Sequence, residues 1–599
     1  MAKKYVSRRN LEFMLYEVFD IVGMTQYPYY SAHNKKMFDM TLDAALKLSK
    51  DLLNPIFEEM DRQGPVLENG KVKVHPMVRT IMQRFGEGGW IAAKFQEEFD
   101  GAQLPYLIAD ACNFIFSAAN YSAHVFPGLT SKAARLITSF GSQEQIDTYV
   151  PKMLNGEWQG TMALTEPQAG SSLADITTTA VPTDKGYYLL QGQKIFISAG
   201  DHDGVDNVVQ MLLAKIEGAP AGVKGISMFI VPNQRIAADG GLEPNDVTIT
   251  QIYHKMGYRG APITELSLGE KGDCRGWLVG EPHNGLSYMF QMMNGSRLGV
   301  GMGAIGISSA AYYAALDYAR ERPQGRLVPD PATAQVPIIE HADVRRMLLF
   351  QRAFVEGAFS LLMQCCRYSD LELAVEGEEK EKASLLLDLL IPVAKTYPSE
   401  TSILSTSQAI QIFGGYGYCE DFPVEQHFRD TRIHAIHEGT TGIQGMDILG
   451  RKVRMKGGKA FTLFVQEVNA TIAAARALEK LAPYADRLAT ALEELQQVTE
   501  QLKGFGEEKG TRAMLADATL YLEYFSLIAI AWQWLLQSIA AEKALAGKPS
   551  QSNQQFYQGK LHTTRYFFHY ELPKTAGLAQ RLKEQEAITL EMEKDIFND

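Results

Sequence analysis

An acidic residue followed at once by glycine and threonine, Glu438-Gly439-Thr440, is the first candidate for chemistry in this chain. Because glycine has no side chain, the backbone beside the carboxylate can approach a ligand closely. With Ile436 and Ile443 on either side, we expect the carboxyl group to be partly desolvated and its pKa to be raised, as suits a general base. The alternative is a capping or solvated glutamate near a helix end.

A second candidate is the segment 162–171, with the sequence MALTEPQAGS. Thr165 and Ser171 supply hydroxyl groups, and Gly170 allows a ligand to approach the main chain. Hydroxyl groups and free backbone N–H groups of this kind can form hydrogen bonds with the carbonyl and imide edges of a flat heterocycle, or with a phosphate. A surface turn is the alternative interpretation.

Two further segments have aromatic or glycine-rich sequences that suit a cofactor. In the predicted strand 194–198, two-residue alternation puts Phe196 and Ser198 on one face, where they could cover one side of a ring system. The alternative is a core aromatic beside a serine at the strand end. Residues 411–418 (QIFGGYGY) end a predicted helix with glycines, which indicate either an extended C-cap or close approach of the backbone to a pyrophosphate or adenosine.

The elements that carry these segments follow from hydrophobic periodicity and predict a mainly α fold with an inserted β domain. The first 160 residues are expected to be all-helical, with helices over 36–62, 109–119 and 131–140 and a possible kink at Pro55. Strands are predicted over 187–198, 207–216 and 225–232, as an antiparallel sheet or small barrel. Long helices follow over 300–320, 341–371 and 380–412, with bends expected at Pro392 and Pro398.

The last block of the chain is again helical by its period, with the clearest helices over 484–502 and 512–545. Gly457, Gly458 and Lys459 are expected to join it to the preceding helices. We therefore predict four domains: an N-terminal helical domain (1–159), a middle β domain (160–285), a helical domain with the catalytic base (286–452) and a C-terminal helical extension (453–599).

Composition limits the class of protein. The 599 residues are 46% hydrophobic and 21% charged, as in an ordinary globular protein, and the net charge of -12 argues against a nucleic-acid partner. An odd number of cysteines without metal-type spacing fits a reducing compartment: Cys112, Cys274, Cys365, Cys366 and Cys419. Acidic residues interrupt any apolar run near the N-terminus, and no long uncharged apolar stretch follows. We expect a cytoplasmic protein without stable membrane insertion and without a metal site.

Taken together and in this order, the segments resemble those of the acyl-CoA dehydrogenase family. The matching elements are A-x-T-E-P-x-A-G-S at 163–171, K-x-F-I-S at 194–198, Q-I-F-G-G-x-G-Y at 411–418 and P-V-E…R-D…E-G-T at 423–440. The resemblance covers about residues 80–452, and the length with its added C-terminal helices is similar to the larger members, such as 3-methylmercaptopropionyl-CoA dehydrogenase and bacterial long-chain acyl-CoA dehydrogenases.

The resemblance implies a role for each matching residue. Glu438 matches the base that removes the α-proton of an acyl-CoA thioester while the β-hydride passes to FAD, which gives a trans-2,3-enoyl-CoA. The residues that match cofactor-binding positions are Met162, Leu164, Thr165, Gly170, Ser171, Phe196, Ile197, Ser198, Arg322, Gln324, Gln411, Gly415, Thr440 and Gly442. The residues that match substrate-contacting positions are Ser171, Asn294, Arg297 and Gly439.

The resemblance also implies partners and leaves alternatives open. An electron-transfer flavoprotein would take the electrons, whereas an acyl-CoA oxidase of the same fold would use O₂. A DNA-associated flavoprotein of this fold would need a basic C-terminal block, but the charges after Arg454 nearly cancel. The C-terminal extension is expected to occupy the surface through which smaller relatives form tetramers, which implies a homodimer. The usual Lys-Thr-Phe after Arg322 is replaced, and His437 stands where Tyr is common.

Overall fold

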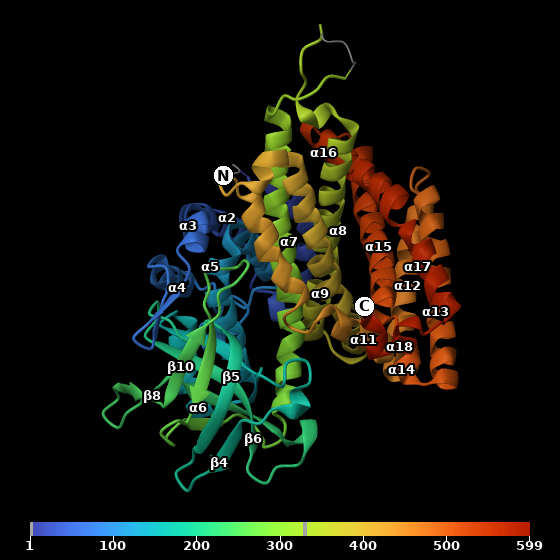
Figure 1. Ribbon diagram of the computed structural model, residues 1–599. Coiled ribbons are helices and arrows are strands. Elements are labelled where there is room, and N and C mark those ends of the chain that lie inside the picture. Colours follow the sequence, from blue (N-terminus) through green and yellow to red (C-terminus); the bar gives the residue numbers. More distant parts are fainter. Residues whose placement is uncertain (1–3, 328–331, 599) are drawn as a thin grey trace. The chain divides into compact units, whose positions relative to one another are not determined.

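The computed structural model describes residues 4–327 and 332–598 (Figure 1). The chain forms two compact units. The helical unit consists of Met1–Met40, Tyr106–Phe114 and Arg297–Asp599, and the sheet unit consists of Thr41–Pro105 and Ile115–Ser296.

The N-terminal part of the sheet unit differs from the expected all-helical opening. The helix expected over 36–62 is interrupted after α2 (Lys35–Leu48) by a π turn and a 3-10 turn, and α3 (Phe57–Arg62) follows. Pro55 lies in the 3-10 turn, because a proline has no N–H with which to continue the α-helical ladder. A small hairpin of β1 (Val66–Glu68) and β2 (Lys71–Lys73) was not predicted.

The two helices expected over 109–119 and 131–140 belong to one long element, α5 (Tyr106–Phe140). Asn120 separates them, with extended φ and ψ of -165° and 98°. Its side-chain amide donates to the carbonyl oxygen of Leu53 at 3.2 Å. After α5, the helix α6 (Gln143–Leu154) begins with a capping box between Ser142 and Gln145.

The sheet unit contains an eight-stranded mixed sheet. Its strands are β3 (Trp158–Ala163), β4 (Thr179–Pro182), β5 (Tyr188–Ser198), β6 (Asn207–Ile216), β7 (Ile226–Pro232), β10 (Val247–Ile252), β11 (Ile263–Leu268) and β12 (Arg275–Leu278). The pairings β5-β12-β7-β6-β4-β5 close a ring, so the expected barrel-like form is confirmed. The alternative of an antiparallel sheet does not hold, because β6 pairs in parallel with both β3 and β4.

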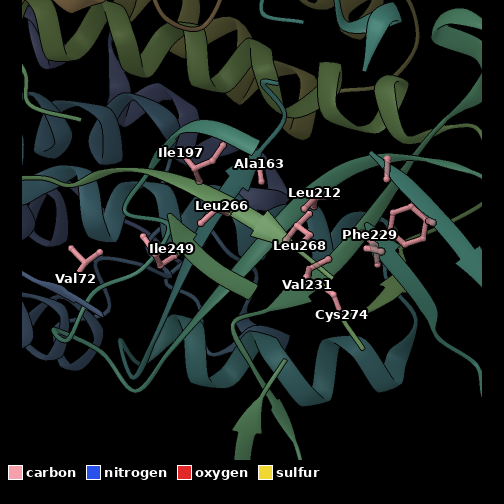
Figure 2. Packing of buried hydrophobic residues seen from close by; sticks show 13 residues of the cluster. Val72, Ala163, Ile197, Leu212, Phe229, Val231, Ile249, Leu266, Leu268 and Cys274 are labelled. Carbon is pink, nitrogen blue, oxygen red and sulfur yellow. The ribbon is translucent and has the colours of Figure 1, made fainter. Parts of the chain in front are cut away.

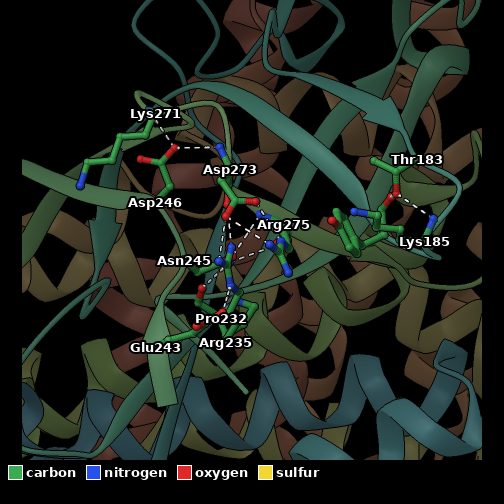
Figure 3. A network of polar contacts seen from close by, with 11 residues as sticks. Thr183, Lys185, Pro232, Arg235, Glu243, Asn245, Asp246, Lys271, Asp273 and Arg275 are labelled. Carbon is green, nitrogen blue, oxygen red and sulfur yellow. Dashed lines mark hydrogen bonds and ion pairs between the residues drawn. The ribbon is translucent and has the colours of Figure 1, made fainter. Parts of the chain in front are cut away.

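Buried apolar side chains from several strands form the core of the sheet unit (Figure 2). Leu212, Phe229 and Val231 come from the central hairpin β6–β7, and Ile197 and Leu266 come from β5 and β11. Away from this core, Arg235 forms ion pairs with Glu243 at 2.6 Å and with Asp273 at 2.7 Å (Figure 3). These pairs tie the hairpin of β8 (Gln234–Ile236) and β9 (Leu242–Pro244) to the turn before β12.

Long helices make up most of the helical unit (Figure 1). They are α7 (Gly285–Glu321), α8 (Ala342–Ala374), α9 (Gly377–Phe413), α10 (Val424–Thr431), α11 (Thr441–Gly450), α12 (Met455–Arg476), α13 (Ala482–Lys509), α14 (Thr511–Met514), α15 (Ala518–Ala546), α16 (Gln551–Tyr566) and α17 (Lys574–Glu584). Of these, α7 begins in the sheet unit and continues into the helical unit.

Three details of the helical unit bear on the predictions. The bends expected at Pro392 and Pro398 do not break α9, which continues through both buried prolines as one helix. At the expected joint, Lys456, Gly457 and Gly458 all have left-handed φ and interrupt the first turn of α12. The helix expected over 512–545 is interrupted after Met514 and resumes as α15.

Among the residues that the structure describes, two helices, α7 and α15, are long and apolar enough by composition to cross a membrane. Their most apolar windows are 83% and 89% buried inside the protein, as in the core helices of a folded domain.

Candidate active site

Glu438 lies on a strained turn between the 3-10 turn η11 (Arg432–Ala435) and α11. Its φ of 54° is left-handed, which is uncommon for a residue other than glycine and persists only where the surroundings impose it. Gly439 continues the turn with φ of 89°, and a side chain there would meet the Nε2 of buried Gln444 at 2.5 Å. The same Nε2 donates to the carbonyl oxygen of Glu438 at 3.4 Å.

After Gly439 the chain enters α11 through Thr440, whose hydroxyl caps the helix by accepting a hydrogen bond from the N–H of Ile443 at 3.3 Å. Gly442 lies in the first turn of this helix. The apolar enclosure expected from Ile436 is wrong, since its side chain is 52% exposed. Ile436 follows η11 in the chain and does not pack into the core, whereas Ile443 and Glu438 are half-buried.

Two cationic side chains act on Glu438 from neighbouring helices. Arg297 on α7 is buried and lies 3.5 Å from Asp447 of α11. Lys395 on α9 is fully buried. Burial lowers the pKa of Lys395 to about 8, against the opposing effect of the negative charges of Glu438 and Glu400.

In the sheet unit, backbone and side-chain hydrogen bonds fix the segment 162–165 beside the end of β5. The N–H of Ile195 donates to the carbonyl oxygen of Thr165 at 2.9 Å, and the Nζ of Lys194 donates to that of Leu164 at 3.1 Å. The hydroxyl of Thr161 donates to the carbonyl oxygen of Ser198 at 2.6 Å. The structure therefore brings together two of the segments that the sequence singled out, and Met162 lies beside them as part of β3.

A buried ion pair locks this arrangement. The Nζ of Lys194 lies 2.8 Å from the carboxylate of Glu166, and both side chains are almost completely buried. Glu166 also accepts from the N–H and hydroxyl groups of Thr177 and Thr178 and from Gln168. Burial opposes the charge of Glu166, but the charge of Lys194 and these donors outweigh it and lower the pKa of Glu166 to about 2.

Phe196 presents an open aromatic face at the end of β5. Its φ is 57°, its ring is 58% exposed, and the ring centroid lies 4.6 Å from that of Tyr253. A shift of register opposite Glu265 interrupts the alternation here, so that Lys194 and Ile197 both face the core, while Phe196 and Ser198 do not. Because the side chain of Ile197 is in the core, only its main chain could contact a ligand.

The remaining parts of the sheet segment are open to solvent. Gly170 and Ser171 are exposed, and nothing lies within 4 Å of the position where a side chain at Gly170 would begin. An exposed aromatic ring beside hydroxyl groups and unobstructed main chain suits a planar, hydrogen-bonding heterocycle. The residues present therefore fit the flavin that the sequence implies.

A separate group lies where α7 and α9 end together. Tyr318 of α7 stacks on Phe413 of α9, with ring centroids 4.2 Å apart, in a small apolar cluster. This contact brings the residues after α7 to the same end of the unit as the glycine turn after α9. The predicted cofactor residues there are all exposed: Arg322, Gln324, Gln411 and Gly415.

Of the predicted substrate residues, Asn294 and Arg297 lie about one turn apart on α7, and Gly439 adjoins Glu438. Lys395, Gln444 and the pairing of Glu166 with Lys194 were not predicted from the sequence. A signal for Lys395 exists in the sequence, because its charge follows the apolar run 389–394. Within the described residues, no group of three or more His, Cys, Asp or Glu side chains could hold a metal ion.

Family models match four successive parts of the chain. They are described as the acyl-CoA dehydrogenase N-terminal domain (38–157), middle domain (161–270) and C-terminal domain (283–453), and as acetyl-CoA dehydrogenase C-terminal like (464–593). The chain is 36% identical to 3-methylmercaptopropionyl-CoA dehydrogenase of Ruegeria pomeroyi, over 89% of this chain and 90% of that protein. The chain belongs to the acyl-CoA dehydrogenase family.

Other relatives extend the likeness over nearly the whole chain. A butyryl-CoA dehydrogenase of Syntrophomonas wolfei is 35% identical over 93% of both chains. The structure of an acyl-CoA dehydrogenase complexed with FAD from Bacillus anthracis superimposes with a TM-score of 0.71 and 21% identity, over 98% of this chain and 93% of that chain, which supports the fold. As a member of this family, the protein is an FAD-dependent oxidoreductase that acts on acyl-CoA.

Proposed function

We propose that this acyl-CoA dehydrogenase oxidises its substrate to a trans-2,3-enoyl-CoA with Glu438 as the base. The observation that carries this proposal is the half-buried Glu438 on a left-handed turn, with two buried cations on neighbouring helices. A turn of that kind fixes the direction in which the Glu438 side chain leaves the main chain. The α-proton of the thioester moves to this carboxylate.

The main chain at the same residue supplies the second requirement of the reaction. An α-proton is acidic enough only if the thioester carbonyl meets donors where enolate charge develops. The N–H of Glu438 makes no backbone hydrogen bond within the described residues, so it is available as one such donor. Gly439 keeps the approach to it open, because it has no side chain.

The flavin, when bound, accepts the hydride from the β-carbon. We assign its ring and ribityl chain to the sheet segment, where Phe196 offers its face and Thr165, Ser171 and Ser198 offer hydrogen bonds. The full proposed cofactor set is Met162, Leu164, Thr165, Gly170, Ser171, Phe196, Ile197, Ser198, Arg322, Gln324, Gln411, Gly415, Thr440 and Gly442. For the acyl-CoA we propose contacts with Ser171, Asn294, Arg297 and Gly439.

The proposal extends to the setting of the enzyme. We propose electron transfer to an electron-transfer flavoprotein, a cytoplasmic homodimer, and the four-domain division at residues 159, 285 and 452. The family models, which match 161–270, 283–453 and 464–593 separately, support a division of this kind. Rapid reoxidation of the substrate-reduced enzyme by O₂ with release of peroxide would contradict the proposed electron acceptor.

The base is tested with Glu438→Gln. We expect a folded, yellow protein that binds acyl-CoA without bleaching of the flavin absorbance, a loss of at least about 10⁴-fold in rate, because the amide cannot accept the α-proton. The matched control is Glu378→Gln, an exposed carboxylate in the first turn of α9 that should leave bleaching intact. Bleaching of Glu438→Gln at the wild-type rate would assign the base elsewhere. A panel of CoA thioesters, from propanoyl to palmitoyl with sulfur-containing acids, then defines the substrate.

A further inference from the structure

Lys395 is a fully buried cation in the middle of α9, and its Nζ makes no hydrogen bond with any described part of the chain. A buried ammonium group without a partner is unfavourable, because it has lost its hydrogen bonds to water and forms none with the protein. Three residues to either side lie the buried prolines Pro392 and Pro398, through which the helix continues. The charge of Lys395 therefore lowers the free energy of unfolding, at a position that lies inside a regular helix.

The packing of α7 against α9 fixes this position. Pro398 has no N–H to donate to the carbonyl oxygen of Ala394, one turn earlier in α9. Gly301 of α7 packs against that oxygen so closely that a side chain there would begin 2.3 Å from it. The two backbones thus meet beside Lys395, and Arg297 lies one turn before Gly301 on α7.

The charged and titratable groups that act on Lys395 come from three elements besides its own. Glu438 raises the pKa of Lys395 most, followed by Glu400 on α9. Arg297 on α7 lowers this pKa, as burial does. The remaining titratable group near Lys395 is His434 on η11. Burial lowers the pKa of this histidine to about 4, so its imidazole is neutral near pH 7.

The other charges around Lys395 already have partners. Glu400 is exposed and accepts from the hydroxyl of Thr441, and Arg297 pairs with Asp447. Glu438 has the largest opposing effect on the buried ammonium, and no ion pair joins its carboxylate to a described residue. No salt bridge joins the two side chains, so their attraction acts across a gap in a weakly screened environment.

We propose that Lys395 is a positioning residue for the reaction, a buried cation that acts through space to keep Glu438 ionised and oriented when substrate excludes water from the site. This inference rests on the proposed role of Glu438 as the base. Lys395 forms no bond with the substrate and keeps its proton, while the α-proton passes to the Glu438 carboxylate. Without the cation, desolvation would favour the protonated form of Glu438 and inactivate a larger fraction of the enzyme at low pH.

The test is the pH profile of flavin bleaching by acyl-CoA in FAD-loaded Lys395→Met and Lys395→Gln. We expect the acid limb of kcat/KM, the pH region in which the rate falls as Glu438 gains a proton, to shift to higher pH by about one unit. The rate at a pH below this region then falls about tenfold, because the lost cation no longer favours the carboxylate. Lys395→Arg retains the charge and should keep the wild-type limb to within a few tenths of a unit.

The matched control is Lys452→Met, which removes a buried lysine of the same unit that pairs with Asp388. It should leave the acid limb where it is in the wild type. Acid limbs of folded Lys395→Met or Lys395→Gln that coincide with the wild-type limb would overturn the proposal. With an inactive Glu438→Gln, that result would refute only the role of Lys395, whereas an active Glu438→Gln would refute the base assignment itself.

Discussion

Two lysines, one in each unit of the molecule, are equally buried and differ in their hydrogen-bond partners. Lys194 in the sheet unit is 0% exposed and bonds to Glu166 at 2.8 Å and to the carbonyl oxygen of Leu164 at 3.1 Å. Lys395 in the helical unit is also 0% exposed, but its Nζ has no hydrogen-bond partner among the described residues. Burial alone therefore does not say what a charged residue does.

The partners of the two lysines indicate different roles. Lys194 and Glu166 satisfy each other and hold the segment 162–165 against β5, so the pair shapes a binding surface. The Nζ of Lys395 forms no hydrogen bond that would hold a loop in place, and it interacts with Glu438 only electrostatically. A satisfied buried ion pair suits a structural brace, and an unsatisfied buried charge suits an electrostatic role near reacting atoms.

The largest expected effect follows from breaking the satisfied pair. Lys194→Met leaves the carboxylate of Glu166 buried without its counter-charge, and removing one partner of such a pair costs about 3–5 kcal/mol of unfolding free energy. We also expect weaker FAD binding, because the segment beside Phe196 loses its anchor. Urea titration of the flavin-free protein measures the first effect, and FAD titration by fluorescence measures the second.

The double variant Glu166→Gln/Lys194→Met is the control for this prediction. It should recover part of the lost stability, since no lone charge remains. Lys395→Met is the matched variant from the other unit, and it should not destabilise the protein. If Lys194→Met and Lys395→Met lowered stability equally, the distinction between the two lysines would fail.

A smaller effect is expected from the contact that fixes Lys395. In Gly301→Ala, the added methyl group would begin 2.3 Å from the carbonyl oxygen of Ala394 and 3.0 Å from a methyl group of Leu362. The helices must move apart, which typically costs about 1–3 kcal/mol. Gly295→Ala in the same helix meets nothing within 4 Å and should be neutral or stabilising. Equal urea midpoints for both variants would show that α7 and α9 do not pack as closely as described.

Much of the sheet unit could be predicted from local sequence, whereas the environment of the base could not. An apolar, β-branched run between turn residues predicted the bounds of β6. The interruption of alternation near Phe196 was missed, because it depends on the register of β11 against β5. Local patterns carry no information on such pairing between distant strands.

The environment of the base in the helical unit also depends on packing between distant segments. The helix α9 continues through Pro392 and Pro398, and Ala394 between them packs closely against Gly301 of α7. The enclosure of Glu438 was assigned to its neighbour Ile436. The structure puts charges from α7 and α9 there instead, and Lys395 is 43 residues from Glu438 along the chain.

The smallest expected effect tests whether the penalty at Lys395 comes from its charge. Burial lowers its pKa from 10.5 in the unfolded chain to about 8, so the cost of the charge is fully present below pH 8 and disappears as the pH rises towards 10.5. Lys395→Met should therefore be more stable than the wild type at pH 7. Between pH 8 and pH 9 this advantage should shrink by about 1 kcal/mol, because the native wild-type protein releases the proton that the unfolded chain still holds. Urea titrations of both proteins at pH 7, 8 and 9 measure the difference, from which other titrating groups cancel. An advantage that stayed constant over this range would mean that the folded protein holds this proton as tightly as the unfolded chain does, so that the penalty at Lys395 does not come from its charge.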